Sequence, residues 1–254
     1  MLHTETLGVG PRIVLVHGFT QTGRSWATVA TGLARDHEVV LVDAPGHGGS
    51  AAVRADLLEG AELLGQAGAV GTYVGYSMGG RLALHLALSR PQLVSCLVLI
   101  GATAGVEDDA ARAARRDTDA ALATALEREG LDAFLQQWLA QPLFASLPSR
   151  AAGLDDRRRN TVDGLAWSLR SCGTGAQQPL WDRLGSLAMP VLVMAGEHDE
   201  RFTAIGRRMV QAMGDNATFV PVPGTGHAAH LEQPEVFVEL LRAWLAGVNV
   251  ARGR

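Results

Sequence analysis

Residues 72–80, Thr-Tyr-Val-Gly-Tyr-Ser-Met-Gly-Gly, constrain the fold of this chain more than any other stretch. A β-forming run leads into a Gly-x-Ser-x-Gly pattern centred on Ser77, and an apolar, helix-forming run follows at 82–88. Glycines two positions before and after a serine remove the Cβ clashes of a strained turn. The pattern predicts a strand, a sharp turn and a helix, with the Ser77 hydroxyl exposed beside the helix N-terminus. An ordinary turn is the alternative, because the chain contains 30 glycines.

The composition excludes several classes of protein. The chain has 254 residues, of which 47% are hydrophobic and 19% charged, as is typical of a soluble globular protein. Its net charge of −4 provides no broad basic surface for nucleic acid. No apolar run approaches the roughly 20 residues that span a bilayer, and the N-terminus lacks the basic and apolar regions of a signal peptide. We therefore expect a cytoplasmic protein with neither a nucleic-acid nor a membrane partner.

The reactive side chains argue against a bound metal or cofactor. Cys96 and Cys172 are the two cysteines, too few for a disulfide framework and without metal-ligand spacing, so we interpret both as packing residues. All 22 basic residues are arginine, and the absence of lysine excludes Schiff-base and pyridoxal chemistry. We expect no metal and no cofactor.

Buried strands alternate with helices along most of the chain. Continuous apolar runs are typical of parallel strands that are covered on both faces. Strands are predicted at 13–17, 39–43, 73–76, 97–100, 190–195 and 218–222, and helices at 26–34, 56–66, 82–88 and 234–245. This alternation predicts an α/β fold with a mostly parallel sheet flanked by helices and joined by right-handed crossovers.

The alternation stops between about residues 105 and 185, where apolar residues recur at helical spacing and no convincing strand is found. We expect residues 1–104 and 186–254 to form one α/β core and residues 105–185 to form an inserted helical lid over the C-terminal edge of the sheet, where α/β proteins bind ligands. A packed helical decoration is the alternative. Arg157, Arg158 and Arg159, beside two aspartates, are expected to form a solvated helix face.

A serine nucleophile needs a base, and the base needs an orienting acid. Asp199 follows the strand at 190–195 and is the expected acid, with Glu197 and His198 as competitors. His227 follows the last strand in a glycine-rich loop and is the expected base, with His230 as a weaker rival. The three groups occur at strand ends in the chain order nucleophile, acid, histidine.

An oxyanion that forms near Ser77 needs two N–H donors. The backbone of Met78, next to the serine, is the first candidate. The second is Phe19, in the loop after the 13–17 strand. His17 is expected to brace that loop, and His47 also looks structural.

These motifs together resemble the α/β-hydrolase superfamily over nearly the whole chain. A narrower resemblance is to the 2-succinyl-6-hydroxy-2,4-cyclohexadiene-1-carboxylate synthases of menaquinone biosynthesis. It is carried by His17-Gly-Phe-Thr, Pro45-Gly-His-Gly-Gly-Ser, Gly75-Tyr-Ser-Met-Gly-Gly-Arg, Trp138-Leu-Ala-Gln-Pro-Leu-Phe and Gly196-Glu-His-Asp-Glu-Arg-Phe. This resemblance implies an α/β-hydrolase fold and a reaction in which the activated serine removes a proton from carbon and pyruvate is eliminated from a polyanionic cyclohexene.

Such a substrate requires cations. Arg81 lies one helical turn after Ser77 on the same face and is expected to bind a carboxylate with two hydrogen bonds, or else to form a surface salt bridge. Arg115 and Arg116, early in the lid, are candidates for a second carboxylate. Tyr76 and Trp138 are expected to line the pocket, with plain lid core as the alternative for Trp138.

Three functions remain open. The first is a cofactor-free lyase in which Ser77 is the base, His227 relays the proton, Asp199 orients the histidine and arginines hold carboxylates. The second is a carboxylic-ester or carbon–carbon bond hydrolase that uses the same serine as a covalent nucleophile. The third is a ligand receptor that keeps the fold. The expected partner is a small carboxylate-bearing molecule, and the sequence leaves open a monomer or a homo-oligomer.

Overall fold

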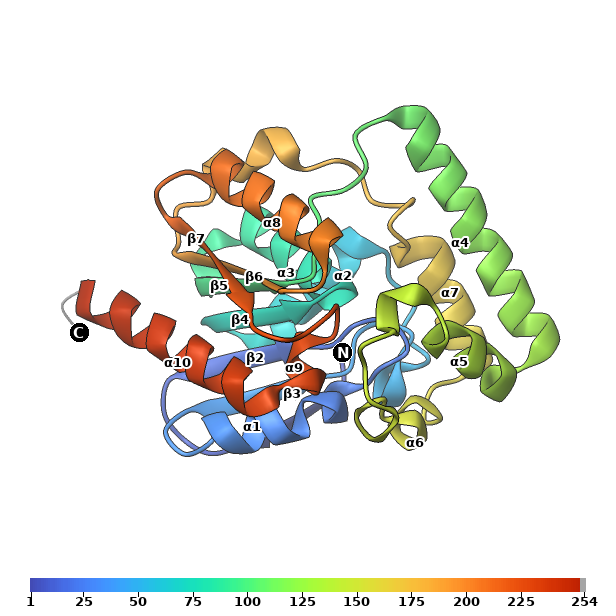
Figure 1. Ribbon diagram of the computed structural model, residues 1–254, viewed down its shortest axis with the longest axis horizontal. Coiled ribbons are helices and arrows are strands. Elements are labelled where there is room, and N and C mark those ends of the chain that lie inside the picture. The colour runs from blue at the N-terminus through green and yellow to red at the C-terminus, as the bar shows by residue number, and fades with distance from the viewer. Residues whose placement is uncertain (252–254) are drawn as a thin grey trace.

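The computed structural model describes residues 1–251, in which seven strands form one sheet in the order β1-β3-β2-β4-β5-β6-β7 (Figure 1). β1 pairs with β3 in the antiparallel direction, and the other neighbouring strands are parallel. The strands are β1 (Thr4–Leu7), β2 (Arg12–Val16), β3 (Glu38–Val42), β4 (Gly71–Tyr76), β5 (Val94–Ile100), β6 (Val191–Gly196) and β7 (Ala217–Val222). The predicted α/β fold with a mostly parallel sheet is confirmed.

Two elements of the core were not predicted from the sequence. β1 is an edge strand of four mostly exposed residues, so it carries no apolar pattern that would reveal it. The helix α8 (Glu200–Met213) follows β6 and begins at Asp199, whose side chain accepts a hydrogen bond from the Phe202 amide. Its apolar residues face the sheet and its arginines are exposed to solvent, the pattern of an amphipathic surface helix.

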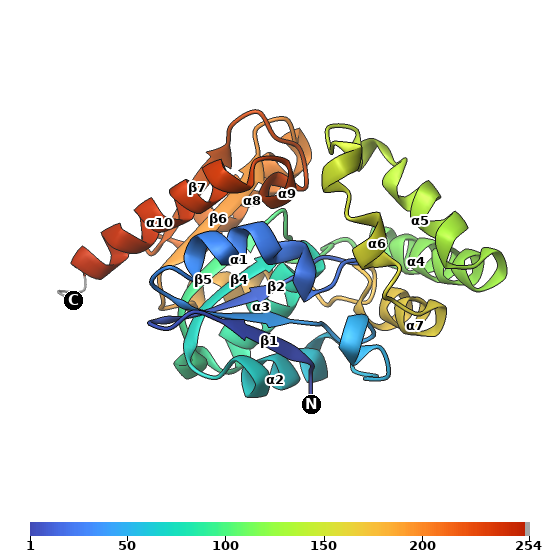
Figure 2. The ribbon, with the colours of Figure 1, turned by 90° about the horizontal axis from the view of Figure 1, so that it is seen from below.

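Helices cover both faces of the sheet (Figures 1 and 2). Alternate residues of each strand point to opposite faces, so Ile13 and Leu15 belong to one apolar core while Val14 and Val16 belong to the other. α1 (Ala27–Leu33) and α10 (Pro234–Ala251) cover the first core. α2 (Leu57–Gly68), α3 (Met78–Ser89) and α8 cover the second.

Four further helices lie between β5 and β6 in the sequence, and they stand beside the carboxyl edge of the sheet (Figure 2). They are α4 (Asp109–Glu129), α5 (Leu131–Leu139), α6 (Leu154–Arg157) and α7 (Val162–Cys172). This insertion has an apolar cluster of its own, which includes Leu126, Phe134 and Leu165.

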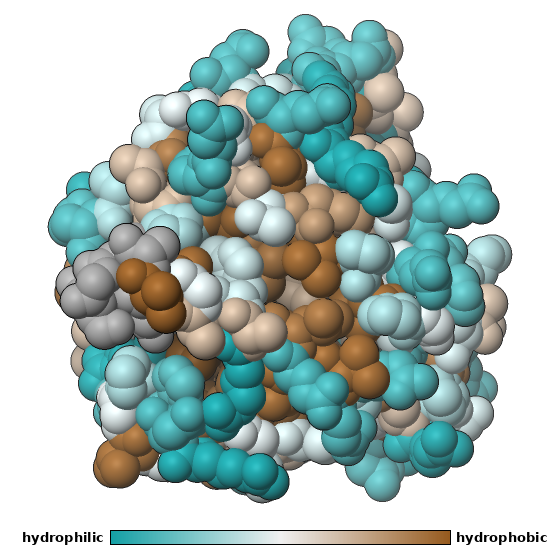
Figure 3. All heavy atoms as spheres, turned by 60° about the vertical axis from the view of Figure 1, so that its left-hand side comes forward, coloured by the Kyte–Doolittle hydropathy of each residue, from teal (hydrophilic) through white to brown (hydrophobic). Residues whose placement is uncertain are grey.

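On the face shown in Figure 3, hydrophilic side chains surround a smaller central area of apolar ones. None of the helices in residues 1–251 combines the length and the apolar character that crossing a membrane requires. Cys96 and Cys172 are both buried, in agreement with the packing role expected for them.

The turn between β4 and α3 has the strained geometry that the sequence predicts. Ser77 has φ 51° and ψ −107°, in a region that side-chain-bearing residues rarely adopt. A Cβ on Gly75 would lie 2.4 Å from the Gly79 carbonyl oxygen, and a Cβ on Gly79 would lie 2.3 Å from the Val16 carbonyl oxygen. Both contacts are with backbone, so the two glycines permit the close packing of α3 against the ends of β2 and β4.

We predict that Gly79→Ala destabilises the protein by about 3 kcal/mol, because the strand backbone cannot move away from the added methyl group. Gly247→Ala, in α10, is the matched control, since a Cβ there meets no atom within 4 Å. That control should stabilise the protein by about 0.5–1 kcal/mol through helix propensity. Urea unfolding followed by circular dichroism measures both changes, and equal stability of the two variants would contradict this account of the turn.

Candidate active site

The structure brings Asp199 and His227 together at the carboxyl edge of the sheet. Asp199 Oδ2 lies 2.7 Å from His227 Nδ1, and both side chains are buried. The other carboxylate oxygen, Oδ1, accepts the Phe202 amide at 3.1 Å, which fixes the orientation of the carboxylate. Because Nδ1 faces a carboxylate, Nδ1 carries the proton and Nε2 is left as the acceptor in the neutral ring.

The two loops that carry this pair are joined by backbone contacts. The Glu197 amide donates to the Val222 carbonyl at 3.0 Å, and the His198 amide donates to the Thr225 carbonyl at 2.9 Å. The Glu232 carboxylate accepts the amides on either side of His227, those of Gly226 and Ala228, at 2.8 and 3.1 Å. These bonds hold the histidine loop in one conformation.

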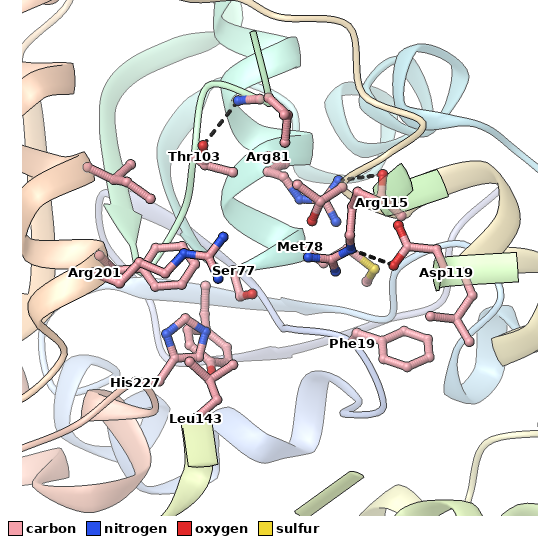
Figure 4. A pocket seen from close by; sticks show the side chains of 18 of the residues that line it. Phe19, Ser77, Met78, Arg81, Thr103, Arg115, Asp119, Leu143, Arg201 and His227 are labelled. Carbon is pink, nitrogen blue, oxygen red and sulfur yellow. Dashed lines mark hydrogen bonds and ion pairs between the residues drawn. The ribbon is translucent and has the colours of Figure 1, made fainter. Parts of the chain in front are cut away.

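A glycine at the end of β5 makes room for the imidazole. Gly101 has φ +54°, and a Cβ there would lie 2.8 Å from His227 Cε1. A side chain at this position would displace the ring from its place. Ser77 and His227 line the same pocket (Figure 4).

The predicted oxyanion donors also meet at this edge. Phe19 and Met78 both line the pocket, and neither of their amides has a hydrogen-bond acceptor among the described residues. His17 braces the loop, as expected: its Nε2 accepts the Ala44 amide at 3.0 Å and its Nδ1 donates to the Gly18 carbonyl at 2.8 Å. His47 bonds the Pro45 carbonyl through Nδ1, and burial lowers its pKa to about 3.

The pocket has a volume of about 490 Å³. In the view of Figure 4, the side chains of Ser77, His227 and Arg201 lie in one half of the pocket, and those of Arg81 and Arg115 lie in the other. Cations therefore occur on both sides of this pocket. It is lined by Phe19, Gln21, Tyr76, Ser77, Met78, Arg81, Arg115, Asp119, Trp138, Phe144, Arg157, Arg201, Arg208 and His227, among others.

Arg81 is a buried cation in this pocket and forms no surface salt bridge. It is 7% exposed, and its guanidinium makes one long hydrogen bond within residues 1–251, 3.4 Å from Nη1 to the Gly173 carbonyl. No carboxylate of the described residues lies within ion-pair distance of it. Burial lowers the pKa of Arg81 to about 10, so it keeps its charge at neutral pH. Burying a charge without a partner is costly, which makes Arg81 a strong candidate for binding an anion.

Arg157 is a second such cation, and the expectation of a solvated face was wrong for it. Its side chain is 2% exposed and lines the pocket. Nε donates to the Ala152 carbonyl at 2.7 Å, and Nη1 donates to the Thr20 hydroxyl. The third guanidinium nitrogen, Nη2, has no acceptor among residues 1–251. Burial lowers the pKa of Arg157 to about 10.

The neighbours of Arg157 explain why the charge run misled the prediction. Arg158 pairs with Asp132 and Asp155 on the surface, as a solvated helix face would. Arg157 is the last residue of the four-residue helix α6, and it alone turns inward. Its guanidinium bonds the hydroxyl of Thr20, in the loop after β2. That tertiary contact leaves no signal in the local sequence.

The two lid arginines take different places. Arg115 lines the pocket, but its Nε pairs with the buried carboxylate of Asp119 at 2.8 Å, so its charge is largely compensated. Arg116 does not line the pocket and donates to the Gly175 carbonyl at 3.4 Å. Successive helical residues project about 100° apart, so only one of the two can face the pocket. The structure thus gives no support to Arg116 as a substrate-binding residue.

The aromatic residues expected in the pocket are present. Tyr76 packs against His227 with ring centroids 5.3 Å apart, and burial raises its pKa. Trp138 packs edge-to-face on Phe19 at 5.0 Å and also contacts the apolar cluster of the insertion. Trp138 is therefore both a pocket residue and part of the packing of the insertion.

Two more arginines line the pocket and were not assigned to it from the sequence. Arg201 follows the expected acid in the chain, and its guanidinium lies 5.7 Å from the Phe202 ring centroid. Arg208 makes two bonds to Glu107, at 2.5 and 2.8 Å, and lies 3.9 Å from the Trp181 ring centroid. The helical spacing of 201 and 208 on α8 would have revealed them, had that helix been predicted.

No cluster of three or more metal-ligating side chains occurs within the part of the chain that the structure describes. The pocket is instead organised around guanidinium groups, which suit anionic oxygens.

We predict that succinate stabilises the protein, because its carboxylates neutralise the buried charges of Arg81 and Arg157. At ten times its dissociation constant the gain in unfolding free energy should be about 1.4 kcal/mol. Arg81→Gln should abolish most of that gain, whereas Arg90→Gln should retain it. Arg90 ends the same helix and pairs with Glu62 on the surface. Thermal unfolding at constant ionic strength measures the effect, and an equal gain in both variants would contradict it.

Comparisons with known proteins agree with this architecture. Residues 13–240 match the model of the alpha/beta hydrolase family. The 2-succinyl-6-hydroxy-2,4-cyclohexadiene-1-carboxylate synthase of Salmonella schwarzengrund is 34% identical over 255 residues, covering 95% of this chain and 97% of that protein. A Bacillus subtilis protein provisionally given the same synthase name is 35% identical over 250 residues, covering 93% of this chain and 90% of its own.

Solved structures give the same result. The structure of MenH from S. aureus matches with a TM-score of 0.91 and 28% identity, covering 98% of this chain and all of that one. A thermophilic esterase from Thermogutta terrifontis matches with a TM-score of 0.81 and 23% identity, which shows the shared fold alone. The chain belongs to the alpha/beta hydrolase family, and within it is similar to the 2-succinyl-6-hydroxy-2,4-cyclohexadiene-1-carboxylate synthases.

Proposed function

We propose that this protein is a cofactor-free lyase that eliminates pyruvate from a polyanionic cyclohexene carboxylate, as a 2-succinyl-6-hydroxy-2,4-cyclohexadiene-1-carboxylate synthase. The observation that carries the proposal is the placement of Arg81 and Arg157 in the pocket that contains Ser77, where both are buried cations without a carboxylate partner in the described part of the chain. A substrate with several carboxylates would supply the missing charges. The identity of 34–35% with the named relatives over more than 90% of the chain supports the same substrate class.

In the proposed mechanism His227 takes the hydroxyl proton of Ser77, and the Ser77 oxygen removes a proton from a ring carbon. Asp199 holds the imidazole in the productive tautomer and stabilises the imidazolium that forms. The electron pair left on carbon is delocalised toward a carbonyl oxygen, for which the Phe19 and Met78 amides are the proposed donors. The carbon–oxygen bond to the leaving group then breaks, and the oxygen keeps the electron pair as the enolate of pyruvate. This enolate becomes pyruvate when it takes up the proton that His227 holds, which returns the histidine to its neutral form.

The arginines act on binding and orientation. Arg81 and Arg157 would each hold a substrate carboxylate in a water-poor pocket, where charge-assisted hydrogen bonds are strong. Arg115 is the weaker candidate, because Asp119 already accepts its Nε. Tyr76 and Trp138 would bound the ring of the substrate. We also propose that the insertion, residues 105–185, serves as the lid of this pocket, with residues 1–104 and 186–254 as the core.

We predict that Ser77→Ala lowers kcat for pyruvate release by about 10³-fold or more, since the group that removes the proton is lost. Arg81→Ala should raise KM by about 10- to 100-fold, because a charged hydrogen-bond donor to the substrate disappears. Ser89→Ala and Arg90→Ala, at the far end of the same helix, should match the wild type. A coupled lactate dehydrogenase assay with enzymatically generated substrate measures these rates. A kcat retained by Ser77→Ala, or an unchanged KM in Arg81→Ala, would remove that residue from its proposed role.

The hydrolase alternative makes a different prediction from the same side chains. A covalent acyl-enzyme would require Ser77 to form a stable adduct with phosphonate esters and to turn over small neutral esters rapidly. The receptor alternative predicts neither activity, and the paired Asp199 and His227 are unnecessary for it.

A further inference from the structure

Asp119, on α4, places a buried negative charge in the wall of the pocket that contains Ser77. Its side chain is 2% exposed. Glu107 and Asp108 also line this pocket, but both are exposed to solvent. A buried carboxylate is costly to keep in a folded protein, and it repels an anionic ligand. The presence of Asp119 in a pocket for a polyanion therefore requires a role that outweighs this cost.

The two oxygens of the Asp119 carboxylate have different partners. Oδ1 accepts the Nε hydrogen of Arg115, one helical turn earlier on α4, at 2.8 Å (Figure 4). Oδ2 accepts the amide of Gly175, in the turn after α7, at 3.1 Å. One oxygen thus orients a side chain of the pocket, and the other joins two segments of the insertion.

The bond to Asp119 leaves part of the Arg115 guanidinium available. Its charge is largely compensated, but within residues 1–251 its terminal nitrogens Nη1 and Nη2 have no acceptor. The guanidinium group is planar, so an acceptor at Nε fixes the direction in which the two terminal nitrogens point. That edge of the group binds a carboxylate through two parallel hydrogen bonds. In Figure 4, Arg115 lies in the same half of the pocket as Arg81.

Asp119 also reduces the repulsion between these two arginines. Burial is the main cause that lowers the pKa of Arg81 to about 10. The positive charge of Arg115 lowers this pKa further, and the negative charge of Asp119 raises it. Two guanidinium groups that face one ligand repel each other, and a carboxylate beside them makes their approach less costly.

We propose that Asp119 is a positioning residue that directs the free edge of the Arg115 guanidinium into the pocket, where Arg81 and Arg115 together hold one carboxylate of the ligand. Its contribution is orientation, since its charge alone opposes binding of an anion. The identity of the ligand as the synthase substrate rests on the proposed function, whereas the orientation of Arg115 does not.

The test is a calorimetric titration with succinate at pH 7 and constant ionic strength. Asp119→Asn keeps the size of the side chain but leaves it one oxygen acceptor. That oxygen should stay with the buried Gly175 amide, because the Arg115 side chain is 38% exposed and has access to water. Arg115 then loses its fixed direction, and the dissociation constant of succinate should rise about fivefold. Removal of a negative charge without loss of orientation would instead lower it.

Three comparisons separate positioning from a purely structural role. Asp117→Asn, the matched control, removes the same charge from an exposed position on α4 and should change the dissociation constant by less than about twofold. In an Arg115→Gln background, Asp119→Asn should add less than about a twofold effect, because the arginine through which it acts is absent. Arg115→Lys keeps the charge but not the planar group, so it should bind succinate about as weakly as Arg115→Gln.

Turnover provides a further readout. Asp119→Asn should raise KM for pyruvate release about fivefold and change kcat by less than about twofold, since an interaction that serves binding is weakened. Urea unfolding verifies that each variant is folded. If Asp119→Asn does not fold, the comparison of Arg115→Lys with Arg115→Gln decides the question.

Several results would overturn the inference. One is succinate binding by Asp119→Asn that is unchanged or tighter. Another is a loss of affinity that persists in the Arg115→Gln background, which would make Asp119 only a clamp between α4 and the turn after α7. Wild-type affinity in Arg115→Lys or Arg115→Gln, or no succinate binding by the wild type, would also overturn it. Failure of the wild type to release pyruvate would refute the proposed function separately, because succinate binding is measured without turnover.

Discussion

The close packing of the β4–α3 turn against the end of β2 is the constraint on which the rest of this structure depends. Gly79 lies so near the Val16 and His17 carbonyls that a Cβ would come within 2.3 and 2.5 Å of them. This contact fixes Ser77 in its strained conformation and directs α3 away from the sheet edge. It also sets the distance between the Met78 amide and the loop that carries Phe19. The geometry around Ser77 therefore depends on backbone atoms packed against backbone atoms. Few substitutions at Gly79 would preserve this contact.

The position of Arg157 depends on a different interaction. α6 is tied to the loop after β2 by the bond from Arg157 to Thr20 and by the Asn160 side-chain amide, which donates to the Thr20 carbonyl at 2.7 Å. The same loop presents Phe19. These hydrogen bonds thus connect the insertion to the loop that carries the proposed oxyanion donor. A substrate carboxylate on Arg157 would reinforce the loop that carries the proposed oxyanion donor Phe19.

Local patterns were sufficient to predict the positions of Ser77, Asp199 and His227, because each residue follows a strongly apolar strand and carries glycines or acidic neighbours of a recognisable kind. The fold was predictable for the same reason. β1 was not predictable, since its four mostly exposed residues show no alternation of apolar and polar side chains. Arg157 was missed because its burial comes from a contact with Thr20, far away in the chain. The sequence could not show which of Arg115 and Arg116 faces the pocket, because a shift of one residue in the predicted helix register exchanges their positions.

The central claim is that this pocket eliminates pyruvate from a polyanion, and one comparison tests it most directly. Wild-type protein should release pyruvate from enzymatically generated synthase substrate with kcat/KM above about 10⁴ M⁻¹s⁻¹, in the ordinary range for enzymes. Hydrolysis of p-nitrophenyl acetate by the same preparation should be at least about 100-fold less efficient, because a neutral ester gains nothing from the buried arginines. Rapid ester hydrolysis without pyruvate release would contradict the account and assign the pocket to a hydrolase.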